Sequence, residues 1–172
     1  MPIPSICEPT ATLLGQAGLS GPSSTRRRAL AALVLSALSP IVWGAGRPAV
    51  EVWKAPTCGC CGDWIRHLQS HGFDVTTHEV GNVAMRARLG LPEALGSCHT
   101  ATVNGYVIEG HVPAPDIQRL LRERPAALGL TVPGMPIGSP GMDGPAYGGR
   151  RDAFDVLLVA RDGSTKVFKR YR

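Results

Sequence analysis

The chain lacks a dense cluster of basic residues, an internal repeat and an apolar run long enough to cross a membrane. Its 18 Lys and Arg stand against 13 Asp and Glu, and aromatic residues make up only 5% of the sequence. Nucleic-acid-binding surfaces combine clustered basic residues with interleaved aromatic ones, so we expect no nucleic-acid partner. The uncharged apolar run at residues 29–42 is shorter than the roughly 20 residues that a transmembrane helix needs.

That apolar run has the surroundings of an export signal. Three arginines at residues 26–28 precede it and small residues at 44–46 follow it, which is the layout of a secretory signal peptide. We therefore predict a signal peptide over residues 1–46 and an exported domain over residues 47–172, with no membrane contact after cleavage. A buried helix and an uncleaved membrane anchor are the alternatives.

The residues around the arginines leave the export route open. The string from Thr25 to Leu30 resembles a twin-arginine export signal, but Ala29 stands where that pattern prefers Phe or Leu. Cleavage after Gly46 would remove three Arg and Glu8, leaving 15 basic and 12 acidic residues and a net charge of +3. It would also remove Cys7, so that four of the five cysteines stay in the exported domain.

Periodicity in the exported part predicts alternating strands and helices. Short apolar or alternating runs bounded by Gly and Pro indicate strands, and apolar residues at helical spacing indicate helices. Asn104-Gly105 is the strongest two-residue signal for a hairpin turn, and Asn82 is placed to cap a short helix. The sequence predicts strands at 50–53, 73–80, 100–103 and 106–109, and helices at 60–70, from 82 to near 90, and from 114 to near 125.

This order of elements predicts an α/β fold. A strand, a helix and a second strand at the start require a crossover and hence a parallel pair. The whole order is that of a thioredoxin-like fold, with a central mixed sheet flanked by helices. Residues 129–149 are rich in Gly and Pro and carry two Met, and we expect a long loop there of the kind that is functional or disordered. Residues 154–160 and 165–171 flank Asp162-Gly163 and predict a C-terminal hairpin.

Three cysteines lie where the first strand gives way to the first helix, in the string Cys58-Gly59-Cys60-Cys61. Backbone N–H groups and the positive end of the helix dipole lower thiol pKa values there, so we expect nucleophilic or metal-binding sulfurs. Cys58 and Cys61 match the redox pair of thioredoxin-like proteins. Cys60 does not fit that role, because a third thiol beside a redox pair invites scrambling. Three thiolates within four residues favour a soft metal, with Cu(I) as the first candidate.

Further candidate ligands lie later in the chain. Cys98-His99 precedes the central hairpin, where a thioredoxin-like fold would place it opposite the start of the first helix, so Cys98 is the expected fourth sulfur. His99 is a candidate ligand, although a lone His is more often a hydrogen-bonded residue. Met135 and Met142 are candidates because thioether sulfur suits Cu(I), although Met also fills irregular gaps in packing.

Two other interpretations of the cysteines remain open. They could be buried or form structural disulfides in an oxidising compartment, although the Gly-rich surroundings and the short spacing do not suit core packing. They could also hold structural zinc. Such sites commonly pair two Cys-x-x-Cys units or combine Cys with His, and here the second half is only Cys98-His99.

The exported domain carries five ordered blocks, which are Lys54–Cys61, Ser97–Thr100, Glu109–Pro113, Val132–Pro136 and Gly138–Met142. Together they resemble the CopG-like copper-resistance proteins over residues 49–172. The resemblance implies a thioredoxin-like fold, residence in the bacterial periplasm and copper bound through the cysteines, as one ion or as a multinuclear cluster. By position it matches Cys58, Cys60, Cys61 and Cys98 with the family cysteines, and it places His99, His111, Met135 and Met142 in the other blocks.

We therefore expect a periplasmic protein that holds Cu(I) through thiolates and serves copper resistance or homeostasis, with redox exchange between copper and thiols. Other periplasmic copper-handling proteins would be its partners. The predicted metal-site residues are Cys58, Cys60, Cys61, Cys98, His99, Met135 and Met142. The alternative is a thiol-disulfide oxidoreductase in which Cys58 is the nucleophile and Cys61 the resolving cysteine. A third hypothesis, a structural zinc module, predicts that chelation unfolds the domain.

Overall fold

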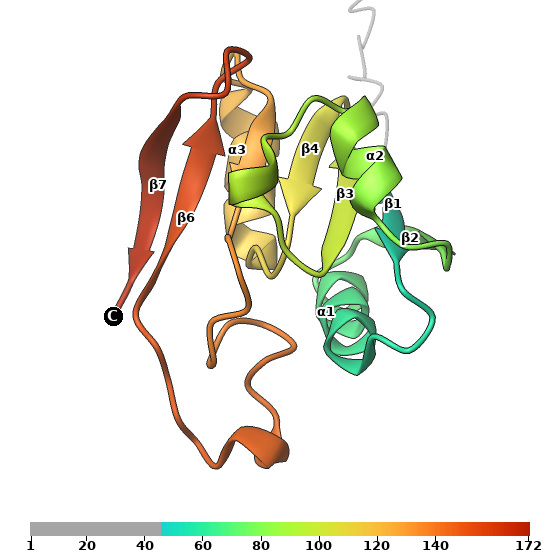
Figure 1. Cartoon of the computed structure of the whole chain (residues 1–172), viewed down its shortest axis with the longest axis vertical. Coiled ribbons are helices and arrows are strands. Elements are labelled where there is room, and N and C mark those ends of the chain that lie inside the picture. The colour runs from blue at the N-terminus through green and yellow to red at the C-terminus, as the bar shows by residue number, and fades with distance from the viewer. Residues whose placement is uncertain (1–45) are drawn as a thin grey trace, which may run out of the picture. The chain divides into compact units, whose positions relative to one another are not determined.

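The computed structural model describes residues 46–172, so the signal peptide predicted for residues 1–46 lies almost entirely outside the described residues. The described chain is built on one seven-stranded mixed sheet with strand order β2-β1-β3-β4-β5-β6-β7 (Figure 1). Among these residues, every helix is too short or too polar to span a bilayer.

The elements follow one another in short succession along the chain. The strands are β1 (Ala49–Lys54), β2 (Asp74–His78), β3 (His99–Val103), β4 (Tyr106–Glu109), β5 (Gly129–Thr131), β6 (Phe154–Val159) and β7 (Thr165–Tyr171). The helices are α1 (Gly59–Ser70), α2 (Val83–Arg88) and α3 (Ala114–Glu123), with short 3-10 turns η1 (Glu93–Leu95) and η2 (Pro145–Tyr147).

The strand pairing confirms the predicted α/β class and mixed sheet. Strand β1 pairs in parallel with β2 across the α1 crossover and antiparallel with β3, and β3 pairs antiparallel with β4. The order β2-β1-β3-β4 followed by α3 is compatible with a thioredoxin-like arrangement. The predicted central hairpin is also present, and its turn residues Asn104 and Gly105 both have positive φ, 46° and 82°, as a type I′ turn requires.

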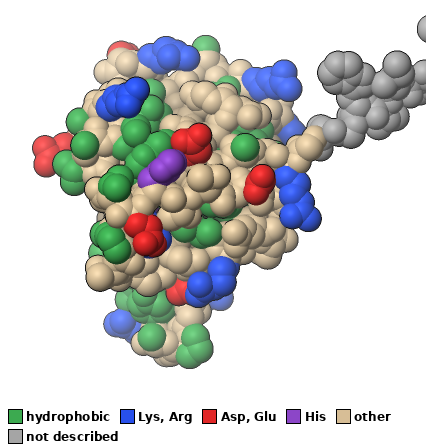
Figure 2. All heavy atoms as spheres, turned by 90° about the vertical axis from the view of Figure 1, so that its right-hand side faces the viewer, with side chains coloured by type: hydrophobic (Ala, Val, Ile, Leu, Met, Phe, Trp, Pro, Cys, Tyr) green, Lys and Arg blue, Asp and Glu red, His purple; other side chains and the backbone are tan. Residues whose placement is uncertain are grey.

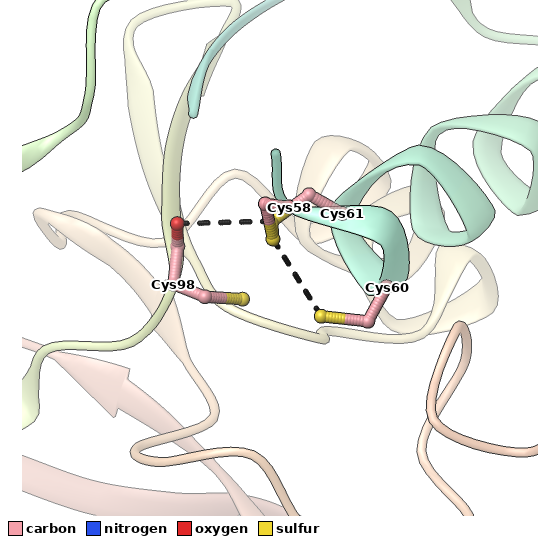
Figure 3. Close-up of side chains that lie close together, drawn as sticks. All are labelled: Cys58, Cys60, Cys61 and Cys98. Atoms are coloured by element: carbon pink, nitrogen blue, oxygen red, sulfur yellow. Dashed lines mark hydrogen bonds between the residues drawn. A yellow bond between two sulfur atoms is a disulfide. The ribbon is translucent and has the colours of Figure 1, made fainter. Parts of the chain in front are cut away.

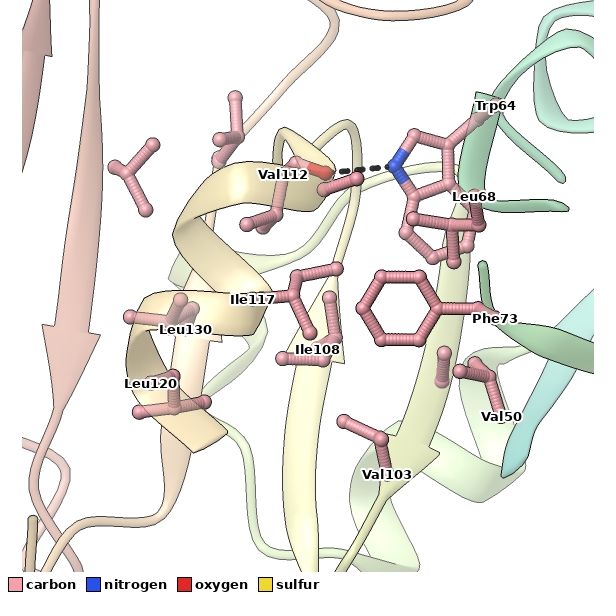
Figure 4. Close-up of a cluster of buried hydrophobic side chains, with 14 of the residues drawn as sticks. Val50, Trp64, Leu68, Phe73, Val103, Ile108, Val112, Ile117, Leu120 and Leu130 are labelled. Carbon is pink, nitrogen blue, oxygen red and sulfur yellow. Dashed lines mark hydrogen bonds between the residues drawn. The ribbon is translucent and has the colours of Figure 1, made fainter. Parts of the chain in front are cut away.

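Helices α1 and α3 cover one face of the sheet (Figure 4). The register places Val50 opposite Val103 and Val52 opposite Ala101, so these four buried side chains share that face. Against them pack buried residues of both helices, which include Trp64, Leu68, Ile117 and Leu120. Removing each such large side chain from water stabilises the fold by about 1.5–3 kcal/mol, and this core fixes the start of α1 against the sheet.

Helix α2 lies over the opposite face. Thr100 of β3 and Glu109 of β4 are paired positions that point away from the α1 face because side chains alternate along a strand. Arg86 of α2 reaches across to Glu109, with Nε 2.9 Å from Oε1. The two faces of the sheet therefore differ in chemistry: one is apolar under α1 and α3, and the other carries a buried polar cluster under α2.

Two details of the sequence-based predictions were wrong. The segment expected to be loop from residue 129 begins with β5, which fits between β4 and β6. Gly129 permits this pairing, because a Cβ there would lie 1.7 Å from the Val107 carbonyl oxygen. Asn82 does precede α2, but it makes no side-chain cap; its amide group donates instead to the Ser97 carbonyl oxygen at 3.1 Å.

The predicted C-terminal hairpin is present as β6 and β7, which pair antiparallel at the edge of the sheet. Lys166, Lys169 and Arg170 lie on β7 as exposed side chains, as expected for a solvated strand. On the face shown in Figure 2, Lys and Arg side chains are scattered among acidic and apolar ones. Basic side chains are therefore dispersed over this face.

Candidate metal centre

Three of the candidate cysteines are positioned by the first turn of α1. Cys58 occupies the N-cap position in extended conformation, and its N–H donates to the Ala55 carbonyl oxygen at 3.1 Å. The buried ammonium group of Lys54 donates to the carbonyl oxygens of Ala55 and Pro56 at 3.1 and 3.4 Å. These contacts fold the end of β1 back over the start of α1, so that the Cys58 sulfur faces the first turn of the helix.

Cys58 and Cys61 form a disulfide. Cys60 and Cys98 are free and partly exposed, and the sulfur of Cys60 lies 3.6 Å from that of Cys58. Figure 3 shows Cys98 approaching this turn from the segment before β3, where its carbonyl oxygen lies 3.7 Å from the Cys61 sulfur. The four sulfur atoms all lie within 4.8 Å of one another. The fold thus brings together the four cysteines that the sequence analysis singled out.

Two buried histidines extend the cluster on the Cys98 side. Nδ1 of His99 lies 3.3 Å and Nε2 of His111 lies 3.1 Å from the Cys98 sulfur, and both rings are 0% exposed. The three ligand atoms lie within 4.8 Å of one another. His111 was not among the predicted metal-site residues. Its position between Gly110 and Val112, directly after β4, is the signal that could have placed it beside Cys98.

The tautomer of His111 follows from its neighbours. Its Nδ1 lies 2.8 Å from the Pro140 carbonyl oxygen, and a carbonyl only accepts, so Nδ1 carries the proton. Nε2 then presents its lone pair to the Cys98 sulfur. Fixing a ligand ring through its second nitrogen is the usual way proteins orient a metal-binding histidine. Pro140 belongs to the Gly/Pro-rich loop, so this loop helps to build the site.

Burial sets the protonation states of these groups. Desolvation and the neighbouring His111 lower the pKa of His99 to about 3, and desolvation also lowers the pKa of His111. Both rings are therefore neutral at pH 7, as metal ligation requires. Burial, followed by the nearby Cys60, raises the pKa of Cys98 to about 12. Cys98 is thus a thiol without metal, and a bound cation must displace its proton.

A buried polar cluster holds the peptide segment that carries Cys98. The Ser97 N–H donates to Glu109 Oε1 at 2.6 Å, and the Ser97 carbonyl oxygen accepts from Arg86 at 2.7 Å. The second oxygen of Glu109 accepts from Thr100 at 2.6 Å. Burial raises the pKa of Glu109. The hydrogen bonds and the charge of Arg86 act to lower it, but burial is the larger effect. Both backbone groups of Ser97 are therefore fixed, and this fixes the direction of the next side chain.

The Gly/Pro-rich loop lies against the start of α1. A Cβ added to Gly141 would come within 2.6 Å of the Cys60 carbonyl oxygen and 2.8 Å of the backbone nitrogen of Trp64, so only glycine permits this contact. The two loop methionines differ. Met142 is 8% exposed and its sulfur accepts a hydrogen bond from Tyr147 at 3.2 Å. Met135 is 53% exposed and lines a pocket together with Cys98.

The donor set fits a soft transition metal. Four sulfurs and two neutral imidazoles converge. Thiolate and imidazole ligands suit copper, especially Cu(I), and zinc better than they suit hard cations. Cys58 and Cys61 can bind as thiolates only after their disulfide is reduced. In the oxidised structure the free donors are Cys60, Cys98, His99 and His111.

One family model and solved structures of related proteins match this chain. A family model described as "Protein of unknown function, DUF411" matches residues 95–142, which include Cys98 and His111. A solved structure named "Copper resistance protein copG- Form 2" is 47% identical, with TM-score 0.68, over 73% of this chain and 99% of that one. "Copper resistance protein copG- Form 1" is 48% identical, with TM-score 0.66, over 72% and 96%. No curated protein sequence matches.

Proposed function

This chain belongs to the family of the copper resistance protein CopG, and from that premise we propose that it binds Cu(I) through Cys58, Cys60, Cys61 and Cys98. The observation that carries the proposal is the convergence of four sulfur atoms within 4.8 Å of one another. Cu(I) prefers soft thiolate and thioether ligands, and a group of sulfurs this compact can bind one ion or bridge several. The neutral rings of His99 and His111 supply further donors beside Cys98.

We further propose that the site works in the periplasm and exchanges electrons with copper. The layout of residues 1–46 supports export, and an exported chain can keep a disulfide. Reduction of the Cys58–Cys61 disulfide takes two electrons and two protons and yields two thiols. Two Cu(I) ions that become Cu(II) would supply those electrons. Copper resistance would then rest on sequestering copper, on passing it to other periplasmic copper-handling proteins, or on changing its oxidation state.

Anaerobic titration tests copper binding directly. The reduced full chain is titrated with Cu(I) against a chromophoric chelator, in parallel with Cys60→Ser and with Ser70→Ala, an exposed position at the opposite end of α1, as a control. We expect tight binding of at least one equivalent, reduced at least about tenfold in affinity, roughly 1.4 kcal/mol, by Cys60→Ser and unchanged by Ser70→Ala. Weak binding with the same affinity in wild type and Cys60→Ser would refute the thiolate copper site.

The Cys58–Cys61 disulfide favours a second candidate function, thiol-disulfide exchange with protein substrates. In that reaction the Cys58 thiolate attacks a substrate disulfide, and Cys61 resolves the mixed disulfide and releases the reduced substrate. The same Cys60→Ser variant separates the two functions. An oxidoreductase keeps its rate of disulfide reduction in this variant and loses it in Cys58→Ser, whereas a copper site is weakened by both.

A further inference from the structure

A solvent-open pocket of about 410 Å³ leads to the cysteine cluster. Cys98 is the cluster cysteine in its lining, and Met135 lines it from the Gly/Pro-rich loop. The pocket thus has one thiol and one thioether in its wall. It offers a small solute a path from solvent to the sulfur that borders both the other cysteines and the two buried histidines.

Met135 is one of a few large apolar side chains that are exposed, at 53%. Its counterpart Met142 shows the ordinary structural use of the residue, since it is buried and hydrogen-bonded by Tyr147. The exposed thioether is a polarizable, neutral donor that stays accessible to a soft cation.

Two hydrogen bonds tie Gly134, the residue before Met135, to the peptide segment that carries Cys98. The Gly134 N–H donates to the Gly96 carbonyl oxygen at 3.2 Å, and the Ser97 hydroxyl donates to the Gly134 carbonyl oxygen. Ser97 is itself fixed by Glu109 and Arg86. The backbone next to Met135 is therefore held against the segment that carries Cys98. Met135 is exposed even though hydrogen bonds fix the adjoining part of its loop.

Three donors of the cluster are buried, whereas Cys58, Cys60 and Cys98 are partly exposed. Cys61, His99 and His111 are 0% exposed, and the Gly/Pro-rich loop contacts the first turn of α1 at Gly141. A cation that enters the pocket meets a lining that contains the half-exposed Met135 and the Cys98 thiol, and the buried donors lie beyond Cys98.

We propose that Met135 is the uptake ligand of the site: it takes Cu(I) from a solvent-exposed donor and passes it to Cys98. This inference rests on the proposed copper binding. The step is a ligand exchange without electron transfer. A thioether bond to Cu(I) forms as the incoming ligand leaves; the Cys98–copper bond then replaces it, and the thiol proton goes to solvent. Because a neutral thioether holds Cu(I) more weakly than a thiolate, transfer runs inward.

Stopped-flow transfer of Cu(I) from bicinchoninate to the reduced full chain tests this role. Met135→Leu keeps the size and apolarity of the side chain but removes the sulfur. We expect the transfer rate to fall about tenfold, equivalent to roughly 1.4 kcal/mol in the barrier, while the equilibrium affinity for Cu(I) stays within twofold. Met85→Leu on α2 is the matched control and should load at the wild-type rate.

A metal-free measurement separates sulfur chemistry from simple access. Alkylation of Cys98 by iodoacetamide, followed by peptide mapping, should proceed at the same rate in wild type and Met135→Leu. Equal Cu(I) loading rates in these two chains would overturn the proposal. So would a fall in the alkylation rate of Cys98 in Met135→Leu as large as the fall in its loading rate. A large loss of equilibrium affinity would overturn it too, because Met135 would then be a resident ligand. A wild-type chain that takes up no Cu(I) would instead refute the proposed function itself.

Discussion

At the scale of single residues, the site divides into groups that short-range spacing predicts and groups that it does not. Cys58, Cys60 and Cys61 were predictable because they share one helix turn, where local geometry alone brings sulfurs together. His111 and Glu109 were not, because their roles depend on how β4 pairs with β3 and on what α2 and the Gly/Pro-rich loop place nearby. Both are fully buried polar residues, and their partners come from segments distant in sequence.

Glu109→Gln tests the importance of the polar cluster beneath Cys98. The change removes the negative charge that faces Arg86, whose side chain is 12% exposed. Loss of one partner of such a pair costs about 3 kcal/mol, and we expect that decrease in the free energy of urea unfolding, together with weaker Cu(I) binding. Glu123→Gln is the matched control, since its exposed pair with Arg119 contributes about 0.5 kcal/mol. Similar effects of the two substitutions would contradict this role.

At the scale of elements, local signals were sufficient where an element is self-contained. The β3–β4 hairpin has its turn residues within it, and α1 has its apolar stripe and a following glycine. Strand β5 was missed because three residues starting with Gly129 carry no pattern of their own, and β4 and β6 impose the extended form on them. The loop after β5 was expected from its composition, but its contacts with α1 and His111 depend on tertiary packing.

Gly141→Ala tests whether the Gly/Pro-rich loop must contact α1. The new Cβ would meet the Cys60 carbonyl oxygen, and the position has φ of +87°, so the substitution combines a clash with backbone strain of about 1–3 kcal/mol. We expect a loss of at least that size in unfolding free energy and lower Cu(I) affinity. Gly144→Ala in the same loop meets nothing within 4 Å and should be neutral. An undiminished affinity in Gly141→Ala would show that the loop is dispensable for binding.

At the scale of the whole molecule, buried titratable groups couple stability to pH. The pKa values of His99, His111 and His67 are lowered, in each case first by burial. Below pH 6.5 the unfolded chain therefore binds protons that the folded chain does not, and stability falls as the pH drops. The pKa values of Glu109 and Asp116 are raised by burial, which acts in the opposite direction.

His99→Phe isolates one of these contributions. With a folded pKa of about 3, His99 should cost the metal-free protein roughly 2 kcal/mol of unfolding free energy between pH 7 and pH 5. We expect the variant to lose less stability than wild type over this interval, by about that amount. Parallel urea unfolding of both chains at several pH values gives the comparison, and parallel pH profiles would contradict the assignment.

The Cys58–Cys61 bond has one further consequence, which is thermodynamic. The same two sulfurs cannot be in a disulfide and bind a cation as thiolates, so copper binds the reduced chain in preference to the oxidised one. By linkage, each tenfold preference of copper for the reduced form raises the midpoint potential of the pair by about 30 mV. The copper concentration around the protein would thus set how easily its disulfide is reduced. The redox potential of the surroundings would in turn set the reduced fraction of the chain, and so how many copper ions it can carry.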